Sequence, residues 1–483
     1  MSKLKNVIRQ LSDADYQEIF NSLMDSGAEK SAHLLKYFKE KQLNDTKIMD
    51  ALDLNTSAYY TMRSRLNQKI EEYLLQQMEN PRTDLVKKTA SIHDVIFSKN
   101  RSLSITTLKK FEKELQSYDL SNELTFVYKL LKKMHAHTPE GYHYKQMYNK
   151  HVAYMLALDK AEDLITEYFR KYGEFFVSSD NNRKLELEYS LKELINVSKL
   201  YQSHRLYVYQ SLVNIFHLIH VDDRFSISES DETIDEIFVK LDKIFEEFYL
   251  DTFYFNIKIV FEYLKLEYYS KYKLFKNVEK YHDEINSVLP KFLECYSLFT
   301  FPYRILLTKL ERNLRLFYER SLYDESRVLL DAIYLDKDDK PSFIIYHSYR
   351  ALTCYYVDKY TEALEWIDKL IENVVFKYYQ EALVQVKLLQ ILLYALNKDK
   401  KGFEQAFGSI KRIINVDNED KETDAVTSYI LAYLKMLRYS FSENNKLKSQ
   451  KMKEFMQKIV LPEEGFCILN YIRLDERLLQ KLM

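Results

Sequence analysis

The chain has 483 residues and a formal net charge of −1, with only 6 glycines and 6 prolines. Average composition would supply about 34 glycines and about 24 prolines at this length. Because sheet proteins need these residues in their turns, all-β and doubly wound α/β folds are nearly excluded. The charge balance excludes the global positive field of a protein that coats nucleic acid or an anionic membrane.

The cysteine content and the hydropathy pattern limit the compartment. Cys295, Cys354 and Cys467 lie far apart and form no CxxC pair, so disulfides are not expected and a reducing compartment fits. The N-terminal segment has no apolar run of signal-peptide length, and no stretch approaches the roughly 18 apolar residues of a membrane span. We therefore expect a soluble, cytoplasmic protein without a membrane partner.

Residues 1–80 are predicted to form a small helical module. The segments 28–43 and 46–52 have helical patterns, and Asp45 is the expected N-cap of the second, because its side chain can accept from a free helix N–H. Residues 53–56 give a turn, and a longer helix is expected over residues 57–78. This is a helix-turn-helix outline. It is similar to the region-four type of helix-turn-helix of bacterial transcription regulators.

The resemblance implies a DNA-facing surface at the start of the longer helix. Its candidate contacts to the major groove or to phosphates are Thr56, Ser57, Tyr59, Tyr60, Arg63, Arg65 and Lys69. Residues 1–90 hold 14 cations and 13 acids, so no basic footprint covers the whole module. The same face could instead dock a protein or cap a neighbouring domain, and we favour that interpretation.

Residues 81–124 are predicted to be connecting helices, because Pro81 can end the helix before it. Over residues 125–440, apolar positions recur at i, i+3, i+4 and i+7, which predicts a long series of helical hairpins. Residues 441–483 are expected to be a linker, solvated over 446–453, and a capping helix. Short polar clusters mark the connections; they are 180–183, 222–232, 336–341, 417–422 and 442–446.

The hairpins show a repeat. In the clearest unit, residues 342–375, Ala351 and Ala363 stand where two antiparallel helices must approach closely, and Tyr360 packs at the turn. Weaker copies occur at residues 275 and 161, and from residue 275 onward successive copies are 37 to 48 residues apart. Tyr323 and Ser326 stand 37 residues before Tyr360 and Ala363. Phe403 and Ala406 stand 43 residues after them.

Residues 358–367, DKYTEALEWI, resemble the tetratricopeptide repeat at this spacing. The resemblance implies an all-α fold, in which a right-handed α-solenoid of helical hairpins follows the N-terminal module. Such a solenoid buries a continuous core between stacked neighbours and leaves a concave face for a ligand. His347 replaces the family's large residue early in the first helix, and the proline at the repeat end is missing. HEAT-like helical pairs are therefore an alternative.

Two groups of histidines are candidate metal ligands. A zinc site needs about four converging donors, but no cysteine lies near the first group and its spacing matches no zinc template. We expect the first group at the surface of a helix–loop–helix junction and the second buried at or near a helix end. The groups are His135, His137, His143 and His151, then His217 and His220.

The sequence contains none of the local motifs of common enzymes. Its six glycines allow no GxxxxGK[ST] and no GxGxxG, and HExxH and GxSxG are absent. We therefore expect no catalytic residue, cofactor or metal. The first hypothesis is a non-catalytic cytoplasmic scaffold or regulator that binds a peptide or partner protein through its helical repeats. The alternative is a transcription regulator that reads DNA with the N-terminal module and senses a ligand with the solenoid; a metal-dependent enzyme is the third hypothesis.

Overall fold

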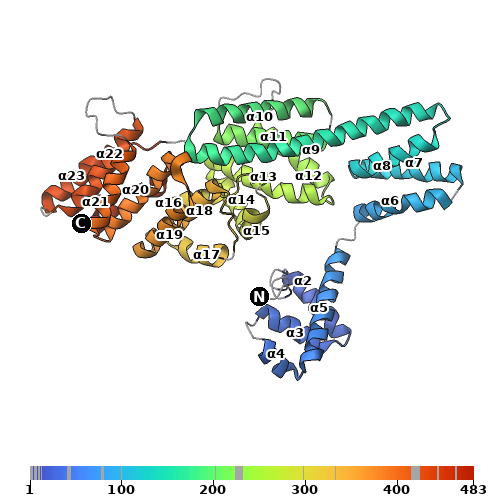
Figure 1. Cartoon of the computed structure of the whole chain (residues 1–483), viewed down its shortest axis with the longest axis horizontal. Coiled ribbons are helices and arrows are strands. Elements are labelled where there is room, and N and C mark those ends of the chain that lie inside the picture. Colours follow the sequence, from blue (N-terminus) through green and yellow to red (C-terminus); the bar gives the residue numbers. More distant parts are fainter. Residues whose placement is uncertain are drawn as a thin grey trace. The chain divides into compact units, whose positions relative to one another are not determined.

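The computed structural model describes residues 4, 8, 11, 13–40, 45–77, 81–98, 100–201, 203–222, 232–296, 298–331, 333–414, 425–442, 445–462 and 465–483. Of these residues, 82% are helical and none is in a strand, which confirms the all-α fold class. The chain divides into two compact units, residues 1–151 and 152–483, and the boundary falls inside helix α9, Glu140–Ser178 (Figure 1). None of the described helices is long and apolar enough to cross a membrane.

Unit 1 is built from helices whose buried side chains form two hydrophobic clusters, one within residues 4–70 and one within residues 85–144. One expected boundary differs from the structure, because Asp45 is the first residue of its helix instead of the N-cap. Helix α5 ends at Gln77, before Pro81, as expected, and Pro81 itself opens the next helix. Proline is tolerated at a first helical position, because the N–H that it lacks would have no partner there. The helices before α9 are α2 (Asp13–Asp25), α3 (Glu29–Glu40), α4 (Asp45–Leu52), α5 (Thr56–Gln77), α6 (Pro81–Ser98), α7 (Arg101–Ser117) and α8 (Ser121–Met134).

Unit 2 continues with helices joined by short connections. They are α10 (Asn181–Lys199), α11 (His204–His220), α12 (Ile234–Glu247), α13 (Thr252–Lys271), α14 (Phe275–Ser287), α15 (Leu289–Cys295), α16 (Arg304–Leu316), α17 (Ser321–Leu330), α18 (Lys340–Tyr356), α19 (Tyr360–Asn373), α20 (Gln380–Leu396), α21 (Lys400–Ile413), α22 (Ala425–Arg438), α23 (Asn445–Met456) and α24 (Glu476–Leu482). Three of the described connections contain a 3-10 turn; these turns are η1 (Phe376–Tyr378), η2 (Tyr439–Phe441) and η3 (Ile468–Tyr471).

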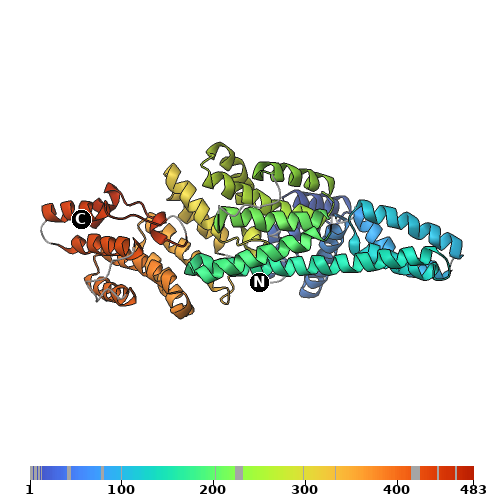
Figure 2. The same cartoon turned by 90° about the horizontal axis from the view of Figure 1, so that it is seen from above.

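Helices that follow one another in unit 2 pack as pairs: α10 with α11, α13 with α14, α18 with α19, α20 with α21, and α22 with α23. The first helices of successive pairs also contact one another, since α18 packs on both α16 and α20, and α20 packs on α22. Helix α11 packs against α9, where the rings of Tyr172 and Phe216 lie 4.6 Å apart. Figures 1 and 2 show these two helices side by side. The pairing is compatible with a helical-repeat fold.

The two helices of a pair differ in burial. In α18 every residue from Pro341 to Tyr356 is buried, whereas α19 buries only a stripe formed by Ala363, Ile367 and Leu370. A helix that is apolar all round lies inside the protein, and an i, i+4, i+7 stripe belongs to a helix with one solvated face. In this pair the first helix therefore belongs to the inner layer of unit 2, whereas in the pair of α10 and α11 the second helix is the more buried one.

A left-handed residue recurs at the turn within the pairs. Lys273, Phe317, Asp358 and Lys398 have φ angles of 59°, 61°, 64° and 56°, and their spacings are 44, 41 and 40 residues. In each turn the following N–H donates to the carbonyl five positions earlier, at 2.8 to 3.0 Å. This is the hydrogen bond of a Schellman cap, which closes the end of a helix. The turns therefore mark the repeat independently of the side-chain pattern.

The C-terminal region departs from the expected order of linker and helix. Residues 446–453 lie within α23, so the prediction of a solvated connection there is wrong. An irregular segment, residues 465–475, follows and contains η3, and the last helix begins only at Glu476. Connections occur at 179–180 and 331–339, close to two of the predicted clusters. The clusters at 223–231 and 417–422 lie outside the described residues.

Candidate functional site

The start of α5 carries the residues predicted to face DNA or a docking partner. Tyr59 is not among the exposed ones, because it is fully buried in the first hydrophobic cluster of unit 1. Burial, together with the nearby Asp45 carboxylate, raises the pKa of Tyr59 to about 12. Arg63 lies 3.6 Å from the Asp45 carboxylate and 6.0 Å from the Tyr60 ring. Its charge is therefore partly used within the module.

The remaining cations of this set lie on another side of α5. Residues two positions apart on a helix point about 200° away from each other, so Arg63 and Arg65 do not share a face. Arg65 and Lys69 are exposed, as are Thr56 and Ser57 at the start of the helix. The seven predicted residues therefore do not form one contact surface.

The residues predicted to pack the repeats lie inside unit 2. Tyr360 is half-buried at the start of α19, where its hydroxyl donates to Asp358 at 2.8 Å. The others are buried, including the two alanines on the facing helices α18 and α19; they are Ala351, Ala363, Tyr323, Ser326, Phe403 and Ala406. Their positions are those of helix-packing residues and not of a ligand site.

The predicted histidine groups are separated by the structure. In unit 1, His135 is buried and its Nδ1 lies 2.9 Å from the Thr138 hydroxyl, so the expectation of a surface position is wrong for this residue. His137 and His143 are exposed. In unit 2, His217 is fully buried and Nδ1 of its ring lies 2.9 Å from the Tyr168 hydroxyl. Among the described residues, no three His, Cys, Asp or Glu side chains are grouped to hold a metal ion.

Sequence reasoning missed a buried ionic cluster in unit 2. The Glu267 side chain, on α13, is 4% exposed, and Arg304 Nε, on α16, donates to its Oε2 at 3.3 Å. The Thr308 hydroxyl donates to Oε1 of the same carboxylate. Burial raises the pKa of Glu267, while Arg304 and Thr308 oppose the shift because they stabilise the charged form. The cluster thus keeps an ion pair inside an all-helical unit.

A cavity of about 360 Å³ adjoins this ion pair. Its walls come from the ends of α9, α11 and α13, from one face of α16, and from the C-terminal segment. Two lining groups, His220 and the Tyr172 hydroxyl, are buried; His220 Nε2 lies 3.4 Å from Glu267 Oε2. Burial and the nearby Arg304 and Lys271 charges hold the pKa of His220 well below its usual value, so the imidazole is neutral.

The charged groups around the cavity differ in how they are paired. Lys271 Nζ donates to the Ile219 carbonyl at 2.9 Å, at the end of α11, and Asp222 lies 3.0 Å from Lys184. Glu311 also lines the cavity, on the same face of α16 as Arg304. Its residue is exposed in part; desolvation of the carboxyl raises its pKa, and the charge of Arg304 and a hydrogen bond with the Tyr471 side chain oppose that shift. The cavity is therefore polar and partly ionic, with several groups already held in place by the protein.

The C-terminal segment lies against the inner helices through main-chain bonds. The Phe466 N–H donates to the Phe176 carbonyl at 3.0 Å, and the Ile468 N–H donates to Gln385 Oε1 at 3.2 Å. The Tyr356 hydroxyl donates to the Tyr471 carbonyl at 2.8 Å. Residues from α9, α18 and α20 thus recognise the backbone of one segment of the same chain.

Side chains of the segment add to these bonds. All residues from 466 to 472 except Asn470 are buried. Arg473 lies 3.0 Å from the Glu319 carboxylate, donates to the Leu314 carbonyl, and places its guanidinium 4.0 Å from the centre of the Phe317 ring. The segment therefore ends in a charged anchor at the end of α16.

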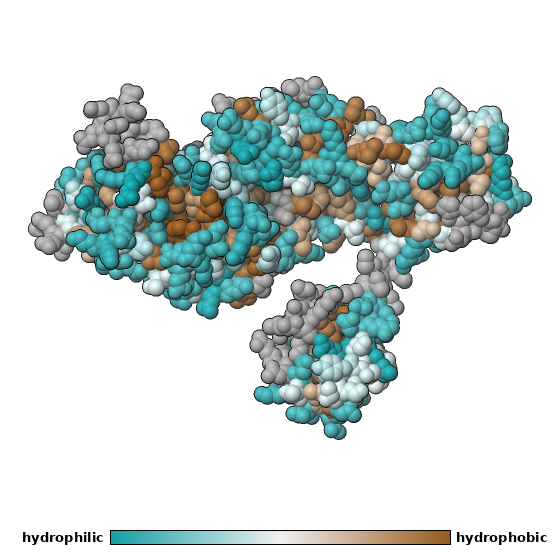
Figure 3. Space-filling view, viewed as in Figure 1, coloured by the Kyte–Doolittle hydropathy of each residue, from teal (hydrophilic) through white to brown (hydrophobic). Residues whose placement is uncertain are grey.

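A groove lined by apolar and polar residues, among them Lys184 and Glu381, continues from this segment toward α20 and α22. Val384, Ile413 and Ile430 line it together with Phe466 of the segment. Figure 3 shows apolar side chains at the surface of these C-terminal helices. The inner surface of unit 2 thus combines apolar contacts with polar groups aimed at a polypeptide backbone.

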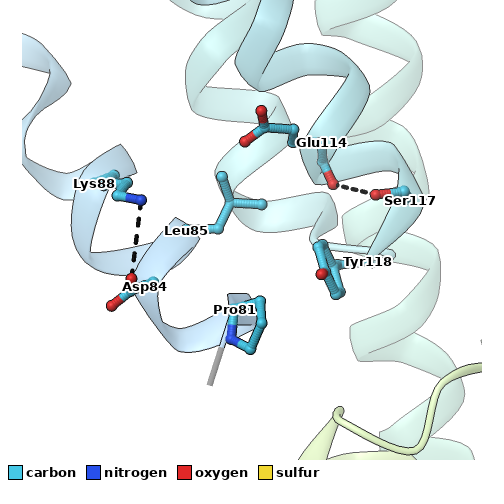
Figure 4. A pocket seen from close by; sticks show the side chains of 7 residues that line it. All are labelled: Pro81, Asp84, Leu85, Lys88, Glu114, Ser117 and Tyr118. Carbon is cyan, nitrogen blue, oxygen red and sulfur yellow. Dashed lines mark hydrogen bonds and ion pairs between the residues drawn. The ribbon is translucent and has the colours of Figure 1, made fainter. Parts of the chain in front are cut away.

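A second hollow lies in unit 1 between the start of α6 and the end of α7 (Figure 4). Its charged groups are paired: Lys88 lies 3.8 Å from Asp84, and Glu114 lies 3.7 Å from Lys110. The Ser117 hydroxyl donates to the Glu114 carbonyl at 2.8 Å. With these groups satisfied by near neighbours, the hollow offers less for a ligand than the cavity of unit 2.

Comparisons with known proteins add no name to this geometry. No protein-family model, no curated protein and no solved structure matches the chain.

Proposed function

We propose that the chain is a non-catalytic helical-repeat protein whose second unit, a tetratricopeptide-like solenoid, binds a segment of a partner protein. The partner segment would lie where residues 465–473 lie now, across α9, α18 and α20. In this proposal the protein acts as a scaffold or regulator, and its own segment occupies the surface until a partner replaces it.

The observation that carries the proposal is the way this segment is held. Phe176, Gln385 and Tyr356 bond to main-chain groups of the segment, which any polypeptide has. Main-chain bonds supply affinity in peptide recognition, and side-chain pockets supply specificity. The backbone of the segment is extended at Cys467 and at Ile472, on the two sides of the short 3-10 turn η3. Main-chain groups outside this turn are available for bonds to the surrounding helices.

The segment also predicts the chemistry of the partner. It supplies large apolar side chains, Phe466, Ile468 and Leu469, followed by a tyrosine and then an arginine that pairs with Glu319. We expect a partner segment with the same order: an apolar or aromatic stretch followed by a cation. An acidic segment would place a carboxylate beside Glu319, and like charges repel.

Competition between the segment and a labelled copy of it tests the proposal. A fluorescent peptide of residues 465–475 is titrated with the full-length chain and with Arg473→Ala, and its anisotropy is measured. The attached segment acts at a millimolar effective concentration, so the wild-type chain should bind the peptide weakly. Arg473→Ala removes the anchor and should bind it at least tenfold more tightly.

Two controls make the result decisive. Lys458→Ala alters an exposed ion pair with Glu454 and should behave as wild type. A scrambled peptide of the same composition should not bind. If Arg473→Ala releases the segment, as seen by faster hydrogen exchange of residues 465–473, and still does not bind the peptide, the proposal is wrong.

No observation favours the DNA-binding alternative over this one. Tyr59 is buried, Arg63 is paired with Asp45, and Arg65 faces another side of α5. Nucleic acid retained by the purified chain and lost in Arg65→Glu would restore that alternative.

A further inference from the structure

The cavity beside Glu267 is lined by several strong hydrogen-bonding groups. Arg304 donates its Nε hydrogen to Glu267, and its side chain is 21% exposed where it lines the cavity. A guanidinium has five N–H donors, so others remain for a ligand. Glu311 is exposed and interacts with the Tyr471 side chain, and a carboxylate has about four acceptor sites, so some of them stay open. The buried His220 lies with Nε2 3.4 Å from the Glu267 carboxylate, and the Tyr172 hydroxyl adds a further polar group.

Two charged side chains of the cavity wall are held in line by α16. Arg304, Thr308 and Glu311 stand at i, i+4 and i+7, which places them on one face of a helix. The rise of about 1.5 Å per residue puts the Cα atoms of Arg304 and Glu311 about 10 Å apart. Arg304 is further fixed by Glu267 and by the Phe176 ring, 5.0 Å from its guanidinium. A positive and a negative group thus face the cavity from fixed positions.

We propose that this cavity binds a small zwitterion that has a free carboxylate and a free ammonium group, such as an amino acid or a short peptide. The carboxylate pairs with the terminal nitrogens of Arg304, which suit two parallel hydrogen bonds to a carboxylate. The ammonium pairs with Glu311. His220 and Tyr172 meet the polar atoms between the two charges. A volume of about 360 Å³ fits a ligand of this size.

The ligand site adjoins the surface that holds the main chain of residues 465–473 and shares Phe176 with it. Its charged groups, Arg304 and Glu311, make none of those main-chain bonds, so the site does not rest on the proposed function. The C-terminal segment only closes one wall of the cavity, through Gly465, Asn470 and Tyr471. A bound zwitterion would make contact with this wall and would slow hydrogen exchange at residues 470 and 471.

A set of matched probes tests the charge requirement. The full-length chain is titrated by calorimetry with the twenty free amino acids and with trialanine, N-acetyl-trialanine and trialanine amide. At least one free amino acid or trialanine should bind below 1 mM. Each blocked form of trialanine lacks one charge and should bind at least tenfold more weakly than trialanine itself.

One substitution separates the two charges without removing the ion pair of the cluster. Glu311→Gln should bind the zwitterion at least tenfold more weakly and should lose the preference for a free ammonium, so that N-acetyl-trialanine binds as well as trialanine. Glu365→Gln, on the exposed face of α19, is the matched control and should bind as wild type. The melting temperature of each unliganded variant verifies that it is folded.

Three results would overturn the proposal. The first is a folded wild-type chain that binds none of the probes at 10 mM. The second is equal binding of a blocked and an unblocked trialanine, which would indicate a site for a simple anion or cation. The third is unchanged selectivity in folded Glu311→Gln. Failure of the peptide 465–475 to bind would leave these measurements unaffected, so the two proposals can fail separately.

Discussion

Two sets of charged side chains in this chain have opposite fates. On α5 of unit 1, Arg65 and Lys69 point into solvent and Arg63 makes a partly exposed pair. In unit 2, Glu267 and Arg304 form an ion pair in which the carboxylate is 4% exposed. Both sets contain charged side chains. The first set lies on one helix and is close in the sequence, whereas the second comes from two helices, α13 and α16, that are distant in the sequence.

This difference teaches where local patterns reveal a site. A cation on an exposed helix is visible in the sequence but costs nothing to leave unpaired in water. A buried charge is expensive without a partner, so its presence indicates a specific arrangement of several helices. The arrangement itself, and not the local motif, makes unit 2 the candidate site.

The largest effect should follow from breaking the buried pair. Glu267→Ala leaves the Arg304 guanidinium without its carboxylate, and removing one partner of a buried pair costs about 3–5 kcal/mol. Lys69→Ala, an exposed change on α5, should alter the free energy of unfolding by less than about 0.5 kcal/mol. Urea unfolding measures the free energy of unfolding of both variants. Equal losses of stability in the two variants would refute the expectation.

Acidification should destabilise the buried region next most strongly. Burial lowers the pKa of His347, on α18, to about 4, while the unfolded chain has about 6.5. Between these values the unfolded chain binds a proton that the folded chain does not. Stability from this group is therefore complete above about pH 6.5 and is lost as pH falls toward 4, by up to about 3 kcal/mol.

His347→Gln removes one of several buried histidines with a lowered pKa and should reduce the slope of this part of the pH curve of unfolding by the share of one proton. The exposed His137→Gln of unit 1 should keep the wild-type slope. If His347→Gln keeps that slope as well, the imidazole is protonated in the folded chain and the expected burial effect is absent.

A smaller effect on the free energy of unfolding should follow from glycine substitutions at left-handed turn residues. We expect it in both units, because it depends only on the conformation of the turn. Lys273 in unit 2 and Asp53 in unit 1 both adopt a left-handed backbone, with φ of 59° and 49°. Glycine avoids the steric cost of this conformation. Lys273→Gly should raise the free energy of unfolding by about 1 kcal/mol, and Asp53→Gly by less, because aspartate tolerates the conformation better than lysine.

Thermal unfolding of the two glycine variants checks this expectation. Lys273→Ala serves as the control, since it keeps a Cβ and should gain nothing. A gain for alanine equal to that for glycine would attribute the effect to the lysine charge instead of to the backbone.

The smallest effect should come from the pair on α4 and α5. Arg63 and Asp45 lie 3.6 Å apart with 22% and 36% of their side chains exposed. Exposed pairs contribute about 0.2–1 kcal/mol and are screened by salt, so we expect a coupling near about 0.5 kcal/mol. A double-mutant cycle with Arg63→Ala and Asp45→Ala measures it, and the coupling should vanish in 1 M salt.

Much of the fold could be predicted from the sequence, because it depends on neighbours along the chain. The scarcity of glycine and proline indicated an all-helical chain, and the two alanines expected at a helix contact, Ala351 and Ala363, are buried on the paired helices α18 and α19. The turns were harder to predict, because they use Lys273, Asp358 and Lys398 where glycine would have been a visible signal.

The cavity could not be predicted, because its parts are distant in the sequence. His220, Glu267 and Arg304 are each separated by roughly 40 residues, and Tyr471 follows far behind them. One local signal was present: Arg304 and Glu311 stand in the i, i+7 relation on α16, and Ile305, Leu306 and Leu307 follow Arg304 directly. A charged residue next to a buried apolar run can indicate a site of this kind.

The C-terminal segment has a consequence for how the protein is made. In a simple repeat array each repeat contacts only its neighbours, so folding can begin and spread during synthesis. Here Phe466 bonds to Phe176, and Arg473 bonds to Glu319. Those contacts must wait until the ribosome has added residue 473. We expect a nascent unit 2 with helical pairs already formed and its inner surface still uncovered, which is the stage at which a chaperone could protect it.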